Sequence, residues 1–97
     1  MATFISLIRY TQQGIETMKD SPGRLDMAKQ VFKSMGASIK EFYLVTGEYD
    51  AVVIGEAPDD ETMAKLALTI GATGAIRTES FRAFTEEEYR KIIAALP

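Results

Sequence analysis

The sequence predicts an α+β fold in which one face of a four-stranded sheet is covered by helices. Segments rich in β-branched and aromatic residues alternate with segments in which apolar residues recur every three or four positions. Acidic runs or a Ser-Pro pair stand where helices would begin. The 97 residues suffice for one hydrophobic core, so we expect a single domain over residues 1–97.

The first predicted strand spans residues 3–10. Phe4 and Ile8 point to one of its faces, and Ile5 and Leu7 point to the other. Because both faces are largely apolar, we expect both sides of the sheet to be covered at this strand.

An irregular segment and then a helix are predicted after this strand. Residues 11–20 carry one helical turn that Gly14 is expected to break. Ser21 can cap the free amides of the next helix, and Pro22 fits its first position. Apolar residues follow at spacings of three and four up to Gly36, which is expected to end the helix.

A β-hairpin and a second helix are predicted for the middle of the chain. Residues 39–46 and 50–57 favour strands and flank a turn that opens with Gly47. The next helix begins in the acidic run 58–61 and carries an apolar stripe as far as Ile70.

A fourth strand and a third helix complete the pattern. The strand spans residues 76–84, and Thr85 and Glu88 then fit a capping box. Phe84 and Tyr89 occupy the positions of a hydrophobic staple. The helix has an apolar stripe that consists of Tyr89, Ile92, Ile93 and Leu96.

This element order is that of a ferredoxin-like βαββαβ sandwich with an added C-terminal helix. Right-handed crossovers place the first and third strands at the centre of such a sheet. The charged pairs Lys40-Glu41 and Arg77/Glu79 suit the two edges. Because helices cover only one face, a second copy of the chain is the simplest cover for the other. We therefore expect a homodimer of the dimeric α/β barrel type.

The composition excludes several kinds of chemistry. The chain has no His, Cys or Trp, so it lacks a Ser-His-Asp or Cys-His pair, a disulfide and a zinc site of the usual type. We expect no cofactor and no metal. Fourteen acidic residues against eleven scattered basic ones also argue against nucleic acid. The N-terminal residues lack a secretory pattern and no apolar run is long enough for a membrane span, so a cytoplasmic location is expected.

The residues around the hairpin resemble those of the GYD domain family. The matching stretches are Gly47-Glu-Tyr-Asp followed by Ala-Val-Val-Ile, the run Lys19-Asp-Ser-Pro-Gly-Arg24, and Ile76 to Thr85. In this chain Glu48 separates the glycine from Tyr49 and Asp50. The resemblance implies a small protein similar to dimeric α/β barrels and implies no particular activity.

Tyr49 and Asp50 are the first candidates for ligand contacts. A phenol beside a carboxylate can orient a ligand or move a proton. The structural alternative is that Gly47 takes a positive φ, Asp50 bonds to the turn backbone and Tyr49 packs over the hairpin.

Three further residues are candidate ligand contacts. Arg77 and Glu79 share one face of the fourth strand, where an arginine can bind a carboxylate or phosphate. The alternative is that these charges pair with neighbouring strands or with a partner. Tyr43 can line a cavity, or it can be half-buried with its hydroxyl in water.

Two classes of function therefore stay open, with a third beside them. The first is a dimeric binding or regulatory module that encloses a small apolar or aromatic molecule. The second is a cofactor-free enzyme that uses proton transfer or oxygen chemistry on an activated aromatic or carbonyl compound. The third is a purely structural assembly protein, because a fold alone does not fix a function.

Overall fold

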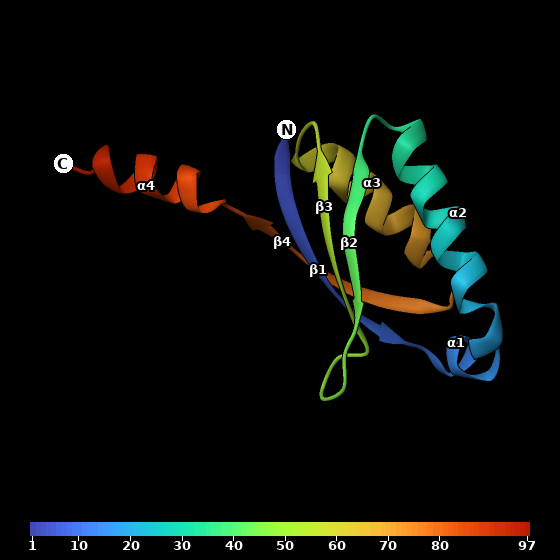
Figure 1. Ribbon diagram of the computed structural model, residues 1–97. Helices are drawn as coiled ribbons and strands as arrows, with labels where there is room; N and C mark the ends of the chain where they lie inside the picture. The colour runs from blue at the N-terminus through green and yellow to red at the C-terminus, as the bar shows by residue number, and fades with distance from the viewer.

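The structure, a computed structural model of residues 1–97, is an antiparallel four-stranded sheet with two helices on one face (Figure 1). The elements in chain order are β1 (Ala2–Tyr10), α1 (Gln12–Glu16), a 3-10 turn η1 (Met18–Asp20), α2 (Ser21–Ser34), β2 (Ser38–Leu44), β3 (Ala51–Ala57), α3 (Asp60–Gly71), β4 (Ile76–Ala83) and α4 (Glu86–Ala94). The predicted α+β fold with its added C-terminal helix is confirmed.

The strand order is β2-β3-β1-β4, so the two most apolar strands lie at the centre as predicted. All neighbours are antiparallel, with Phe4 opposite Gly55 and Leu7 opposite Glu79. The charged strands β2 and β4 form the edges, where unpaired backbone groups face water.

The core lies between the sheet and the helices α2 and α3. Every second residue of β3 is buried, from Ala51 to Ala57, because alternate side chains point to the same face. Phe4 from β1, Phe32 from α2 and Leu66 from α3 meet there.

The opposite side of the sheet, which we call the open face, is covered by no helix (Figure 1). It carries the intervening residues of the strands, among them Ile5, Leu7, Val52, Ile54 and Phe81, and Phe81 is 51% exposed. An apolar sheet face exposed to water is the feature that predicts a second copy of the chain as its cover.

The segment after β1 differs from its prediction. Gly14 lies inside α1, where it is buried, instead of breaking a helical turn. A Cβ atom at Gly14 would overlap the backbone oxygen of Ala75, so only glycine allows this approach. The expected cap at Ser21 is also wrong: Asp20 is the N-cap residue of α2 and makes no side-chain capping bond. The Ser21 hydroxyl lies 3.4 Å from that of Tyr10 instead.

The last helix, α4, begins with the predicted capping box. The Thr85 hydroxyl accepts from the Glu88 amide at 3.2 Å, and the Glu88 carboxylate accepts from the Thr85 amide at 2.9 Å. No residue of α4 is buried, and the helix stands away from the other elements (Figure 1). None of the helices has the length and apolar character that a membrane span requires.

Candidate functional site

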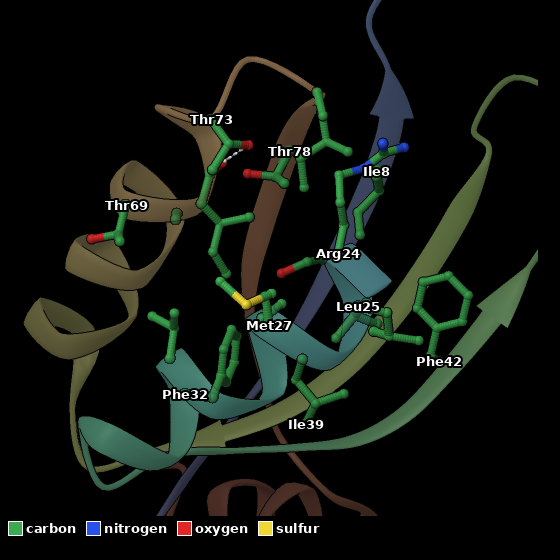
Figure 2. Close-up of a pocket in the computed structure, with 18 of the residues that line it drawn as sticks. Ile8, Arg24, Leu25, Met27, Phe32, Ile39, Phe42, Thr69, Thr73 and Thr78 are labelled. Carbon is green, nitrogen blue, oxygen red and sulfur yellow. Dashed lines mark hydrogen bonds between the residues drawn. The ribbon is translucent and has the colours of Figure 1, made fainter. Parts of the chain in front are cut away.

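A cavity of about 300 Å³ lies between the sheet and the helices α2 and α3 (Figure 2). Its walls are mainly apolar. Leu25, Met27, Ala28, Val31 and Phe32 come from α2, Met63, Ala67 and Ile70 from α3, and Ile8, Ile39, Phe42, Val53 and Ile76 from the strands. Figure 2 shows side chains of α2 and of the strands around a common space, whereas Thr69 of α3 points away from it. An apolar concavity of this size suits a small molecule.

The strand side of this cavity carries hydroxyl groups and no charge. Ser6 from β1 is buried, and its hydroxyl lies 2.8 Å from that of Ser80 on β4. Thr78 lies beside them on β4 and also lines the cavity. Each hydroxyl has one hydrogen to donate and two lone pairs to accept with, so the Ser6–Ser80 pair keeps capacity for a third polar group.

Arg24 lines the cavity from α2, and its guanidinium makes three hydrogen bonds to the α1 segment. It donates to the Thr17 carbonyl at 3.0 Å, to the Thr17 hydroxyl at 2.9 Å and to the Gly14 carbonyl at 3.3 Å. The guanidinium therefore ties α2 to the α1 segment, and the side chain faces the cavity with its apolar part.

The five residues predicted as ligand contacts lie outside this cavity. Two of them, Tyr49 and Glu79, come together: the Tyr49 hydroxyl donates to the Glu79 carboxylate at 3.0 Å. Arg9 stacks on the Tyr49 ring at 4.7 Å and pairs with Glu48 at 2.6 Å. These four side chains form a cluster that we call the hairpin cluster.

The hydrogen bond to Glu79 raises the pKa of Tyr49 above its ordinary value, with loss of hydration adding to the effect. The phenol is therefore held in its protonated, donating form. In this arrangement its proton serves a contact between the hairpin turn and β4.

Asp50 is occupied by the backbone. Its carboxylate accepts from the Tyr10 amide at 2.9 Å, while its own amide donates to the Ile8 carbonyl at 2.8 Å. Gly47, which was expected to allow the turn, has a φ of 136°. These contacts are those of the structural alternative for Asp50.

Tyr43 and Arg77 lie on opposite edge strands and are not brought together. The Tyr43 hydroxyl donates to Glu41 on its own strand, and this bond raises the pKa of Tyr43. Arg77 is opposite Arg9 across the β1–β4 ladder, on the open face.

Sequence reasoning missed the cavity residues, because a space between helices and a sheet has no local sequence pattern. One signal was available. Ser6 interrupts the buried row of Phe4 and Ile8, and Thr78 and Ser80 place two hydroxyls on the same side of the neighbouring strand. No three acidic side chains gather closely enough to hold a metal ion.

Comparison with known proteins gives one family and one fold. The GYD domain family model matches residues 4–93. A protein of Thermus thermophilus named "Glutamine synthetase and cystathionine beta-lyase binding protein" is 32% identical over 84 residues, which are 86% of this chain and 88% of that protein.

Two solved structures share the fold. A protein of Thermus thermophilus superposes with a TM-score of 0.56 at 25% identity, over 88% of this chain and 95% of that chain. A feast or famine regulatory protein of Mycobacterium tuberculosis, complexed with L-methionine, gives a TM-score of 0.67 at 19% identity. The match covers 88% of this chain and 51% of the regulator. At 19% identity the similarity shows a shared fold and nothing more.

Proposed function

The chain belongs to the GYD domain family, and we propose that it is a homodimeric binding or regulatory module that takes a small, mostly apolar molecule into the cavity between the sheet and helices α2 and α3. The observation that carries this proposal is the cavity of about 300 Å³ with apolar walls and a hydroxyl-lined strand side.

The polar groups of the cavity narrow the class of ligand. The pair Ser6–Ser80 and the nearby Thr78 offer hydroxyls only, and the Arg24 guanidinium is held by Thr17 and Gly14. Burying a charge without a charged partner is costly. The end of the ligand that meets the Ser6–Ser80 pair is therefore uncharged and carries one hydroxyl or carbonyl group, as in a small phenol.

Binding is supported better than proton transfer. A general base must reach the proton that it removes. Asp50 is bound to the Tyr10 amide and Tyr49 to Glu79, and neither residue lines the cavity. The enzyme alternative, proton transfer or oxygenation of an activated aromatic or carbonyl compound, is supported less well, because no carboxylate or amine that could act as a general base lines the cavity.

Dimerisation through the open face is part of the proposal. Ile5, Leu7, Val52 and Ile54 form an apolar centre on that face, and Phe81 at its side is half-exposed. A two-fold axis would cover both copies of the patch at once. The hairpin cluster and Arg77 would then lie at the rim of the interface, where charged groups remain wet.

Methyl NMR with labelled methionines tests the ligand site. Met27 and Met63 line the cavity, whereas Met1 and Met18 do not. On titration with 2-naphthol, we expect saturable shifts for the first pair and none for the second. Absence of a saturable shift at Met63 would contradict the proposed site.

Two variants, in each of which one alanine of α3 is replaced by phenylalanine, serve as controls for this experiment. Ala67→Phe fills the cavity and should abolish the Met63 shift, because Ala67 is one of its walls. Ala64→Phe adds the same ring on an exposed position of the same helix and should leave the titration unchanged. If both variants bind 2-naphthol like the original protein, the probe occupies another place.

A second candidate function is binding to a metabolic enzyme. It is supported by the name of the Thermus thermophilus relative, which gives glutamine synthetase and cystathionine beta-lyase as the proteins bound. Sedimentation of this protein with each purified enzyme would test it. Co-sedimentation supports this candidate, and independent sedimentation with both enzymes argues against it.

A further inference from the structure

We propose that α4 is an arm whose apolar stripe packs against a second copy of the chain, beside the open face. The stripe consists of Tyr89, Ile92 and Ile93 in α4, together with Leu96 just beyond the end of the helix. Their exposed fractions run from 44% to 61%, although these are the residues that an amphipathic helix normally buries. The inference rests on the proposed dimer and adds to it the element by which each copy would hold its partner.

Contacts around Arg82 at the end of β4 set the direction of the arm. The Arg82 guanidinium lies 4.4 Å from the Phe84 ring and 5.9 Å from the ring of Phe4 in β1. It also pairs with Glu88 in the first turn of α4 at 3.6 Å and donates to the Thr3 carbonyl at 3.3 Å. The start of α4 is thus fixed to the sheet, although no residue of α4 is buried.

The polar side of α4 needs no partner. Glu86 pairs with Arg90 at 2.8 Å and Glu87 pairs with Lys91 at 3.5 Å, each one turn apart. With these charges paired along the helix and exposed to water, the apolar stripe is the part of α4 left for another molecule. A helix of nine residues is marginal in water by itself, so packing of the stripe would be its main source of stability.

The position of α4 favours a second copy as the occupant. Helices α2 and α3 lie on one side of the sheet, and α4 projects on the other, which is the side of the open face (Figure 1). A copy that covers the open face would therefore stand next to the arm. By two-fold symmetry each copy would both lend its α4 and receive that of its partner, so one association would cover the two apolar surfaces that the chain leaves exposed.

Hydrogen exchange of the α4 amides, measured beside light scattering, tests this inference. In the dimer, we expect the amides of residues 89–94 to exchange more than about tenfold slower than in the monomer. Dilution of the unmodified protein provides the monomer without any substitution. Protection should disappear over the same concentration range in which the dimer dissociates.

A pair of substitutions on opposite sides of α4 sharpens the test. Ile93→Gln removes an apolar contact and should raise the dissociation constant of the dimer about tenfold or more. Lys91→Gln, on the charged side, should leave that constant within about twofold of the original. Equal constants for the two variants would overturn the inference.

The exchange result separates failure of the arm from failure of the proposed dimer. A dimer with unprotected α4 amides would overturn the arm and keep the dimer through the open face, and would leave α4 for another protein. A monomer at every concentration would overturn both. Protected amides in a monomer would show that α4 folds back on its own chain and would also overturn the inference.

Discussion

Single residues of the hairpin cluster link the turn before β3 to strand β4. The Tyr49 hydroxyl donates to Glu79, and this hydrogen bond raises the pKa of Tyr49 above its ordinary value of 10.0. A raised pKa in the folded state means that the contact stabilises the fold fully below pH 10 and less as the pH rises above it.

A titration of tyrosinate by ultraviolet absorbance checks this contact. The original protein should have two tyrosines that ionise above their ordinary range, Tyr43 and Tyr49, and Tyr49→Phe should remove one of the two steps from the curve. Glu79→Gln should move the Tyr49 step back towards pH 10. Tyr43→Phe is the control, because Tyr43 is perturbed by Glu41 instead. An unchanged curve for Glu79→Gln would contradict the assignment.

We expect Asp50 to stabilise the folded protein. Asp50→Ala would leave the Tyr10 amide without its acceptor, at a cost of about 1–3 kcal/mol in the free energy of unfolding. Asp50→Asn keeps an oxygen acceptor and should cost less. Urea denaturation measures both effects. If Asp50→Ala kept its stability but lost binding of 2-naphthol, Asp50 would be a ligand contact instead.

Gly14 and Gly23 offer a matched pair of glycine substitutions. Gly14→Ala would drive its Cβ into the Ala75 carbonyl oxygen and should destabilise the protein by about 1–3 kcal/mol or more. Gly23→Ala lies in α2 with no atom within 4 Å of the new Cβ and should stabilise by about 0.5–1 kcal/mol. Equal midpoints of thermal unfolding would contradict the packing of α1 against Ala75.

At the scale of elements, α4 depends on its capping box. The hydrogen bond from the Thr85 amide lowers the pKa of Glu88 below its ordinary value of 4.5. A lowered pKa in the folded state stabilises above that value, and the contribution is lost as the pH falls through the lowered pKa. We expect the protection factors of the α4 amides, which compare each exchange rate with that of an unfolded peptide at the same pH, to fall in acid. Thr85→Ala should raise the exchange rates of these amides at neutral pH. Equal rates for Thr85→Ala and the original protein would contradict this role of the cap.

Some helices and strands could be predicted from the sequence, and others could not. Both hairpin strands, α3 and the capping box of α4 follow from local signals, such as the turn at Gly47 and the pair Thr85 and Glu88. One helical turn was predicted between residues 11 and 20, but not its passage through Gly14, because the close approach that requires glycine there is to Ala75, sixty-one positions later. Sequence patterns report what a segment favours by itself, whereas contacts of this kind depend on the whole fold.

The candidate site also has features that local sequence patterns could not predict. Tyr49 and Glu79 share a contact that no spacing in the sequence indicated, since the two residues are thirty positions apart. The cavity depends on how α2 and α3 rest on the sheet, so only Ser6 gave a local hint of it. The five residues predicted as ligand contacts are Tyr43, Tyr49, Asp50, Arg77 and Glu79. Ligand binding at these residues remains a prediction, and we expect it at the rim of the proposed dimer.

The whole molecule has two surfaces to which we assign different roles. The helix side of the sheet encloses the cavity, and the open face with α4 offers apolar area to a second copy. A ligand between α2, α3 and the sheet would leave the dimer surfaces free. We therefore expect Ala67→Phe to block binding without changing the dimer and Ile54→Glu to weaken the dimer, as measured by light scattering. A monomeric Ala67→Phe variant would show that cavity and interface are coupled.

The liganded dimer can be tested in a single experiment, native mass spectrometry with saturating 2-naphthol, because one spectrum gives both the number of chains and the number of bound molecules. We expect two chains with two molecules of 2-naphthol, and a dimer without 2-naphthol for the Ala67→Phe variant. A dimer that stays free of 2-naphthol in the unmodified protein would contradict the ligand site, and a single chain would contradict the dimer.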